Sequence, residues 1–177
     1  KPGNVFIDVG AHVGKYSFYA SKQVRDSGLV IAIEPHPKNV ENLKKGMKLN
    51  GLTNIVVVEK ACGNYSGKGF LTEHGTSANY KLVQKPTEIK VEVDTLDDIL
   101  ESLHVRRVDM MKIDVEGCEH EVLQGAYKTI KEFKPLLMVE VILNNKQKIF
   151  QYLQELGYHP APLCKKERYW DVLFNFH

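Results

Sequence analysis

Two kinds of segment are missing from this sequence of 177 residues: a run of apolar residues long enough to cross a membrane, and a secretory signal peptide. Cysteine is also scarce. The three cysteines, Cys62, Cys118 and Cys164, are odd in number and lack the spacing of metal ligands, which argues against a disulfide framework. This use of cysteine predicts a reducing compartment, and we expect a cytoplasmic protein that does not contact a membrane.

An excess of charge of one sign is missing as well. The chain has 24 basic and 22 acidic residues, intermixed, for a net charge of +2. Such a balance gives no strong electrostatic attraction toward nucleic acid or a membrane surface. No basic patch with interleaved aromatic residues stands out either, so we do not expect a nucleic-acid partner.

The glycine pattern of dinucleotide-binding proteins, G-x-G-x-x-G, is absent too. Counted from Gly10, His12 and Lys15 fill the second and third glycine positions, which disfavours a nicotinamide-dependent oxidoreductase. Residues 5–14 instead read V-F-I-D-V-G-A-H-V-G, a buried strand that turns abruptly into a helix at Gly14. Asp8 near the end of this strand suits a ligand with an ammonium group or hydroxyls better than one made of phosphates.

An acid closes the second apolar run of the chain. Glu34 follows the predicted strand Leu29–Ile33 and comes 20 positions after Gly14. An acid at the tip of the second strand is the usual partner of ribose hydroxyls. Together with Asp8 it predicts a ligand with a ribose and an amino acid end, which describes S-adenosylmethionine.

Strand and helix patterns alternate along the rest of the chain, which is typical of a parallel α/β sheet. With 43% hydrophobic residues, we expect one domain over residues 1–177, with a further segment preceding it in a longer protein. Thr95 is a predicted helix N-cap, one helix is expected to run through Val122 to Phe133, and residues 70–93 are expected to form two short antiparallel strands flanking a loop. The remaining predicted strands cover Ile55–Val58, 108–114 and Leu136–Ile142, with a terminal hairpin over 158–163 and 171–176.

Three stretches resemble the FkbM family of S-adenosylmethionine-dependent methyltransferases: F-I-D-V-G-A-H-V-G at 6–14, I-E-P at 33–35, and K-I-D-V-E-G-C-E at 112–119 with V-L-Q-G-A at 122–126. His12 departs from the asparagine that family members often have. The resemblance implies a Rossmann-like αβα sandwich with a mostly parallel seven-stranded sheet in the order 3-2-1-4-5-7-6. It also implies methyl transfer, usually to an oxygen of a small molecule or sugar.

Catalytic candidates must lie at the carboxyl ends of the strands, near the switch point of the sheet. An alcohol acceptor has to lose its proton, and Asp114, Glu116 and Glu140 are the carboxylates placed to take it. Glu116, together with Glu119 and Glu121, also fits a simpler interpretation as an acid that meets a helix dipole. A divalent metal on the three candidates is conceivable, but without a recognisable ligand spacing we predict none.

The predicted cofactor residues divide by the part of S-adenosylmethionine that they would meet. Asp114 is also expected near the amino group of the cofactor, and Ser17 is expected to bind either its carboxylate or the backbone of its own helix. A loop over residues 73–80 is expected either to cover the substrate or to be a solvated turn. The other residues are Asp8, Gly10 and Gly14 for the methionine end, Glu34 for the ribose, Ala61 and Cys62 for the adenine, and Ala11 and His12 in the cofactor loop.

Two alternatives remain beside a small-molecule methyltransferase. One is a nucleic-acid methyltransferase, which the absence of an Asn-Pro-Pro-Tyr motif disfavours. The other is a binding module that keeps the cofactor fold without turnover. The charge balance favours a small, neutral or polar acceptor, while the acceptor itself and the oligomeric state are not predicted.

Overall fold

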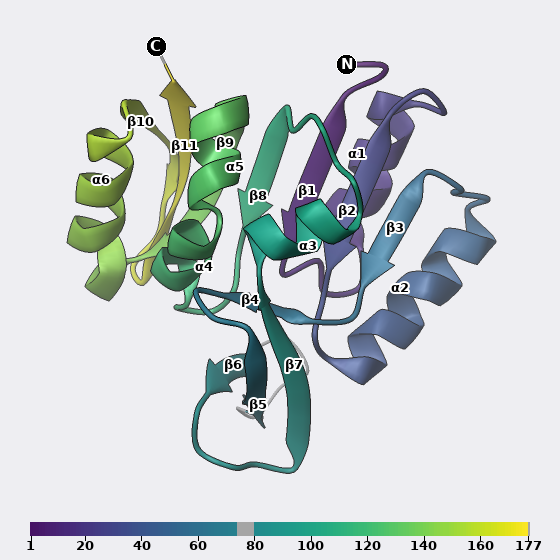
Figure 1. Cartoon of the computed structure of the whole chain (residues 1–177), viewed down its shortest axis with the longest axis horizontal. Coiled ribbons are helices and arrows are strands. Elements are labelled where there is room, and N and C mark those ends of the chain that lie inside the picture. The colour runs from purple at the N-terminus through teal and green to yellow at the C-terminus, as the bar shows by residue number, and fades with distance from the viewer. Residues whose placement is uncertain (74–79, 177) are drawn as a thin grey trace.

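The computed structural model describes residues 1–73 and 80–176 of the chain. Seven strands form the main sheet, in the order β10-β11-β9-β8-β1-β2-β3 (Figure 1). If these seven strands are renumbered 1 to 7 along the chain, their order across the sheet, starting from the β3 edge, is 3-2-1-4-5-7-6. The strands are β1 (Val5–Val9), β2 (Leu29–Ile33), β3 (Ile55–Val58), β8 (Met110–Ile113), β9 (Leu136–Ile142), β10 (Tyr158–Lys165) and β11 (Tyr169–Phe176).

The sheet is mostly parallel, as predicted, and an antiparallel hairpin closes one edge. Strands β3, β2, β1, β8 and β9 run in the same direction, whereas β11 is antiparallel to β9 and to β10. The predicted α/β class and the terminal hairpin are thereby confirmed.

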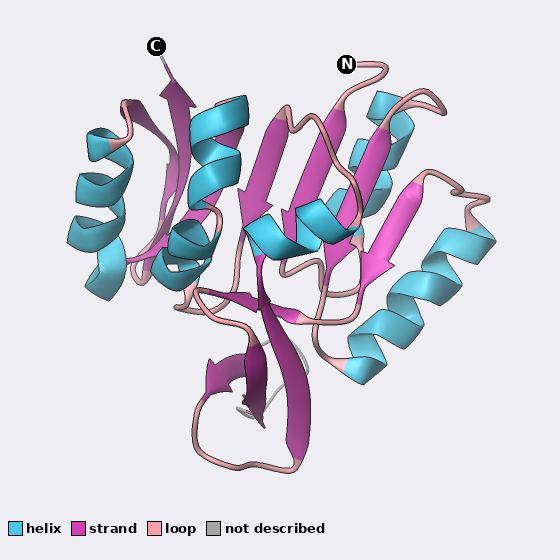
Figure 2. Cartoon of the chain, in the orientation of Figure 1, coloured by secondary structure: helices cyan, strands magenta, loops and turns pink. Residues whose placement is uncertain are grey.

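Helices cover both faces of the sheet and give the molecule three layers (Figure 2). Alternate residues of each strand point to opposite faces: Phe6 packs with α1 and α2, while Ile7 packs with the other helices. No helix in the described part of the chain is long and apolar enough to cross a membrane. The helices are α1 (Lys15–Val24), α2 (Pro37–Leu49), α3 (Leu96–Ser102), α4 (Glu119–Gly125), α5 (Tyr127–Phe133), a 3-10 turn η1 (Leu143–Asn145) and α6 (Lys146–Glu155).

A second, smaller sheet lies at the carboxyl ends of the parallel strands (Figure 1). It has the order β4-β7-β5-β6 and consists of β4 (Ala61–Gly63), β5 (Gly67–Glu73), β6 (Tyr80–Val83) and β7 (Ile89–Thr95). The prediction of two short strands was therefore incomplete, because β5 pairs antiparallel with both β6 and β7. The loop predicted to cover the substrate falls on residues 74–79, which lie outside the described residues.

The helix predicted as continuous through Phe133 is two helices. Its first part, α4, ends at Gly125, and α5 starts at Tyr127. A Cβ atom at Gly125 would overlap the carbonyl oxygen of Gly63, so only glycine lets α4 lie against β4 here. The predicted N-cap is confirmed, because the Thr95 hydroxyl accepts a hydrogen bond from a backbone N–H in the first turn of α3.

Candidate functional site

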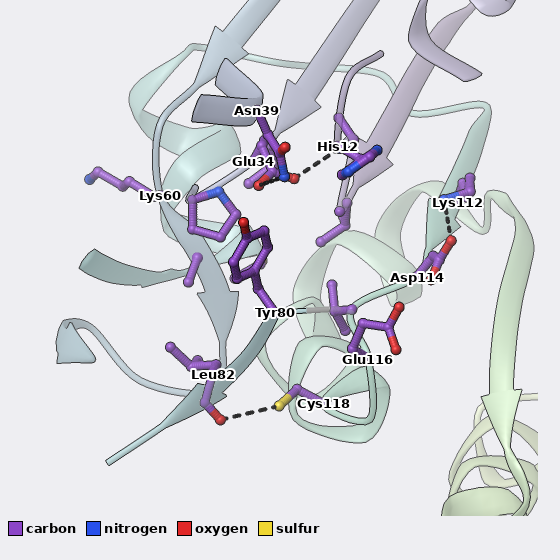
Figure 3. A pocket seen from close by; sticks show the side chains of 18 of the residues that line it. His12, Glu34, Asn39, Lys60, Tyr80, Leu82, Lys112, Asp114, Glu116 and Cys118 are labelled. Carbon is purple, nitrogen blue, oxygen red and sulfur yellow. Dashed lines mark hydrogen bonds and ion pairs between the residues drawn. The ribbon is translucent and has the colours of Figure 1, made fainter. Parts of the chain in front are cut away.

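A cavity of about 300 Å³ opens where β1, β2 and β8 end, and the small sheet forms its opposite wall (Figure 3). This volume lies at the lower end of the range for small-molecule sites. Its position agrees with the general rule that ligands bind at the carboxyl ends of the strands in open α/β sheets. The predicted residues in the wall are Gly10, Ala11, His12, Glu34, Ala61, Cys62, Asp114 and Glu116.

The structure places Asp8 and Ser17 below the cavity wall rather than in it. Asp8 has no exposed surface, and its carboxylate accepts a hydrogen bond of 2.6 Å from the Ser17 hydroxyl. The ammonium of Lys112 lies 3.7 Å from the other carboxylate oxygen. Burial raises the pKa of Asp8, and Lys112 acts against that rise. Asp8 thus binds both Ser17 and Lys112, an arrangement that was not predicted from the sequence.

The two glycines of the first turn serve packing between segments of the chain. Gly10 has a φ of +80°, and a Cβ atom there would overlap the carbonyl oxygen of Asp114 at the end of β8. Gly14 has a φ of +92° and does not line the cavity; a Cβ atom there would lie 2.7 Å from the Phe18 ring. Gly10 therefore lets the β1 turn meet β8, and Gly14 lets α1 begin close to the turn.

Glu34 accepts hydrogen bonds from two backbone N–H groups and one side-chain amide at one end of the cavity. One carboxylate oxygen accepts a hydrogen bond of 2.8 Å from the His12 N–H. The other accepts from the His36 N–H at 2.9 Å and from the Asn39 amide at 3.2 Å. An ionised carboxylate offers about four acceptor positions, so roughly one is left on the oxygen that faces His12. Glu34 can therefore hold the turn in place and still accept a hydrogen bond from a ligand hydroxyl.

Two carboxylates, Asp114 and Glu116, line the cavity on another side, away from Glu34 (Figure 3). The third predicted carboxylate, Glu140, lies next to these two but is not part of the cavity wall. Asp114, Glu116 and Glu140 each offer an oxygen within 4.8 Å of the other two. Burial and the charges of Asp114 and Glu116 raise the pKa of Glu140 to about 8, and burial raises the pKa of Glu116 as well. This acid triad therefore holds a proton near neutral pH, and hard divalent cations also favour such oxygen donors.

Glu119 agrees with the simpler interpretation of an acid at the start of a helix, because it lies in the first turn of α4. Its side chain is fully buried, and it accepts a hydrogen bond of 2.7 Å from the Gly117 N–H. It thus fixes the sharp turn in which Glu116 has a φ of +54° and Gly117 a φ of +101°. This turn places Glu116 in the cavity wall while Glu119 stays behind it.

Several wall residues were missed from the sequence. Lys112 donates a hydrogen bond of 3.1 Å to Asp114 and is 5% exposed. A lysine within the apolar run of a central strand was the signal that could have found it. Tyr80 has no such signal: its ring stacks on His36, with centroids 3.9 Å apart, because the fold of the small sheet brings β6 to the cavity. The other missed wall residues include Tyr16, Lys60, Leu71, Leu82 and Cys118.

Comparisons with known proteins show which family this fold belongs to. A fungal "Methyltransferase 1" from Beauveria bassiana is 28% identical over 70% of this chain and 59% of its own length. The structure of an FkbM methyltransferase from Methylobacillus flagellatus covers 98% of this chain and 44% of that chain, with a TM-score of 0.76 and 19% identity.

A structure of Aeropyrum pernix fibrillarin with bound S-adenosyl-L-methionine has the same fold, with a TM-score of 0.66 and 12% identity over 98% of this chain and 66% of that one. This chain thus spans 59% of the curated fungal relative. The family profile of the methyltransferase FkbM domain matches residues 8–160, which is most of the chain. The chain belongs to the FkbM methyltransferase family.

Proposed function

We propose that this domain transfers a methyl group from S-adenosylmethionine to a hydroxyl oxygen of a small molecule or sugar. The observation that carries the proposal is one cavity with a hydroxyl acceptor, Glu34, at one side and two members of the acid triad, Asp114 and Glu116, at another. Glu34 would bind the ribose, and the wall around Ala61 and Cys62 would lie against the adenine. The roles of Gly10, Ala11 and His12 toward the methionine end follow from their place in the same wall.

The residues present suit such a cofactor and an alcohol acceptor. When bound, S-adenosylmethionine supplies a methyl group on a sulfonium, which leaves as a neutral thioether. The protein therefore needs no group to stabilise a departing anion, and alignment together with removal of the hydroxyl proton remain its tasks. Glu140 and Glu116 would take that proton, while Lys112 holds Asp114 in place.

Three free cysteines support the predicted cytoplasmic location, which we keep as part of the proposal. A nucleic-acid methyltransferase and a binding module without turnover remain the rival functions. The module would bind the cofactor and methylate no acceptor class, so a screen of acceptors with labelled methyl groups separates it from an enzyme. Adding EDTA to the same screen shows whether the acid triad works with a divalent cation or with a shared proton.

The first test is calorimetry with S-adenosylmethionine and its demethylated product, S-adenosylhomocysteine. We expect both to bind, and Glu34→Ala to weaken binding by about 1–3 kcal/mol for the lost charged hydrogen bond. Glu41→Ala is the matched control, since Glu41 is an exposed acid on the following helix that bridges Lys38 and Lys45. Thermal melting of each variant checks that it folds. Binding of NADH in place of both adenosyl compounds would overturn the proposal.

A further inference from the structure

Basic and aromatic side chains gather where β10 turns into β11, although the sequence did not predict a basic patch with interleaved aromatic residues. This hairpin tip comprises residues 165–170 and Lys146 at the start of α6. Four of its side chains are cationic and one, Glu167, is acidic. The local charge therefore differs from the near balance of the whole chain, and its cationic members are Lys146, Lys165, Lys166 and Arg168.

Aromatic rings hold three of these cations in place. The Lys146 ammonium lies 3.7 Å from the centroid of the Trp170 ring, and the Lys165 ammonium lies 4.6 Å from it. Lys166 lies 4.8 Å from the Tyr169 ring and donates a hydrogen bond of 2.6 Å to its hydroxyl. Each ammonium has three donors, so most of these N–H groups remain free for a ligand.

In the part of the chain that the structure describes, none of the four tip cations forms an ion pair. Some cations elsewhere do form ion pairs, such as Lys60 with Asp94 and Arg107 with Asp109. Two ammonium groups beside one indole ring repel each other, and an anion between them would offset that repulsion. The hairpin tip thus has the charge and the free donors of an anion site.

The hairpin tip lies at the carboxyl-terminal end of β9, the strand that carries Glu140 of the triad. Tyr169 pairs with Ile142, the last residue of β9, and Asp171 pairs with Glu140 of the triad. The charge of Asp171 acts on both Lys166 and Glu140. The backbone N–H of Leu143 also donates to the Arg168 carbonyl, which ties the tip to the end of β9.

We infer that the hairpin tip binds a phosphoryl group of the acceptor molecule. The inference rests on the proposed function: it specifies that the methylated hydroxyl belongs to a small phosphorylated compound, and it replaces the neutral acceptor expected from the overall charge. Lysine ammonium groups suit a phosphate as point charges. The ammonium groups of Lys146 and Lys165 already lie against the Trp170 ring, so the ring is poorly placed to stack on a nucleic-acid base. This argues against single-stranded nucleic acid as the ligand.

Trp170 is the single tryptophan of the chain, so tryptophan fluorescence reports on the hairpin tip alone. We would titrate the protein with glucose 6-phosphate, with pyrophosphate and with unphosphorylated glucose at matched ionic strength. Both phosphate compounds should give a saturable change that glucose does not give. Each of these lysines is expected to contribute about 2- to 5-fold in affinity, so a Lys146→Gln, Lys165→Gln double variant should bind roughly tenfold more weakly. Lys68→Gln, an exposed lysine of β5, is the matched control and should behave as the unchanged protein.

The inference is overturned if neither phosphate compound gives a saturable change, or if the double variant responds as strongly as the unchanged protein. A response to a single-stranded oligonucleotide or to anionic vesicles without one to the sugar phosphate would also overturn it, in favour of that ligand. Calorimetry with S-adenosylhomocysteine on the same samples separates the two proposals. Intact cofactor binding without a phosphate response removes only this inference, whereas absent cofactor binding removes the proposed function.

Discussion

Replacing Glu140 by glutamine should change how the stability of the domain depends on pH. The carboxyl of Glu140 has a pKa of about 8 in the folded protein, against 4.5 for an ordinary glutamate, because it is half-buried beside Asp114 and Glu116. Between these two values the folded state holds a proton that the unfolded state has released. Raising the pH therefore favours the unfolded state, and the stabilising effect of the proton is lost as the pH passes through about 8.

The expected size follows from the same pKa values. The folded and unfolded pKa values of Glu140 differ by about 3.5 units, and each unit corresponds to about 1.4 kcal/mol, so the largest possible effect on the free energy of unfolding is about 5 kcal/mol. Solvent screening of the half-buried side chain reduces this effect to about 1–2 kcal/mol. For a domain of 177 residues, each kcal/mol moves the melting temperature by about 2–4 °C. Only about 2 of the roughly 3.5 pH units between the two pKa values lie above pH 6, so going from pH 6 to pH 9 the unchanged protein should lose roughly 1–5 °C more than Glu140→Gln.

Circular dichroism melts at a series of pH values measure this difference without any acceptor. Glu132→Gln, which alters an exposed acid of α5, is the matched control and should follow the unchanged protein. If Glu140→Gln and the unchanged protein lose stability in parallel from pH 6 to pH 9, the acid triad does not share a proton in the way argued above. Once an acceptor is known, the rate should rise with pH toward about 8, as Glu140 becomes able to accept a proton.

Three further substitutions test the packing around the site. Gly125→Ala should lower the free energy of unfolding by about 1–3 kcal/mol, measured by urea denaturation, because its Cβ would meet the carbonyl of Gly63. Lys112→Met should cost about 3–5 kcal/mol in the same assay, because it leaves the Asp8 charge buried without its partner. Adding Asp8→Asn to that variant should restore part of the loss, and no restoration would contradict the ion pair. Thr95→Ala should cost about 1 kcal/mol through loss of the N-cap of α3, and an unchanged urea midpoint would argue against the cap.

The sequence was most informative where a local pattern has one structural outcome. Apolar runs such as Leu29–Ile33 are buried strands, and Thr95 caps a helix, because these features depend on neighbours in the chain. The position of Asp8 was harder to predict. A carboxylate at a strand end can point into a cavity or below it, and the choice depended on Lys112, more than 100 residues away, and on Ser17. Tyr80 is the last residue of the predicted loop over 73–80, but its contact with His36 could not be foreseen, because it follows from the pairing of the small sheet.

The glycines in the family motifs explain why these motifs identify the site so well. Gly10, in the first motif, leaves room for the carbonyl of Asp114, which lies in the third. Gly125 leaves room for the carbonyl of Gly63, the last residue of β4, which contains the predicted adenine contacts Ala61 and Cys62. Each glycine thus allows two distant backbone segments to touch, and each contact fixes one wall of the same cavity. The motifs therefore specify how the cavity is assembled, whereas the hairpin tip and Tyr80 lie outside them.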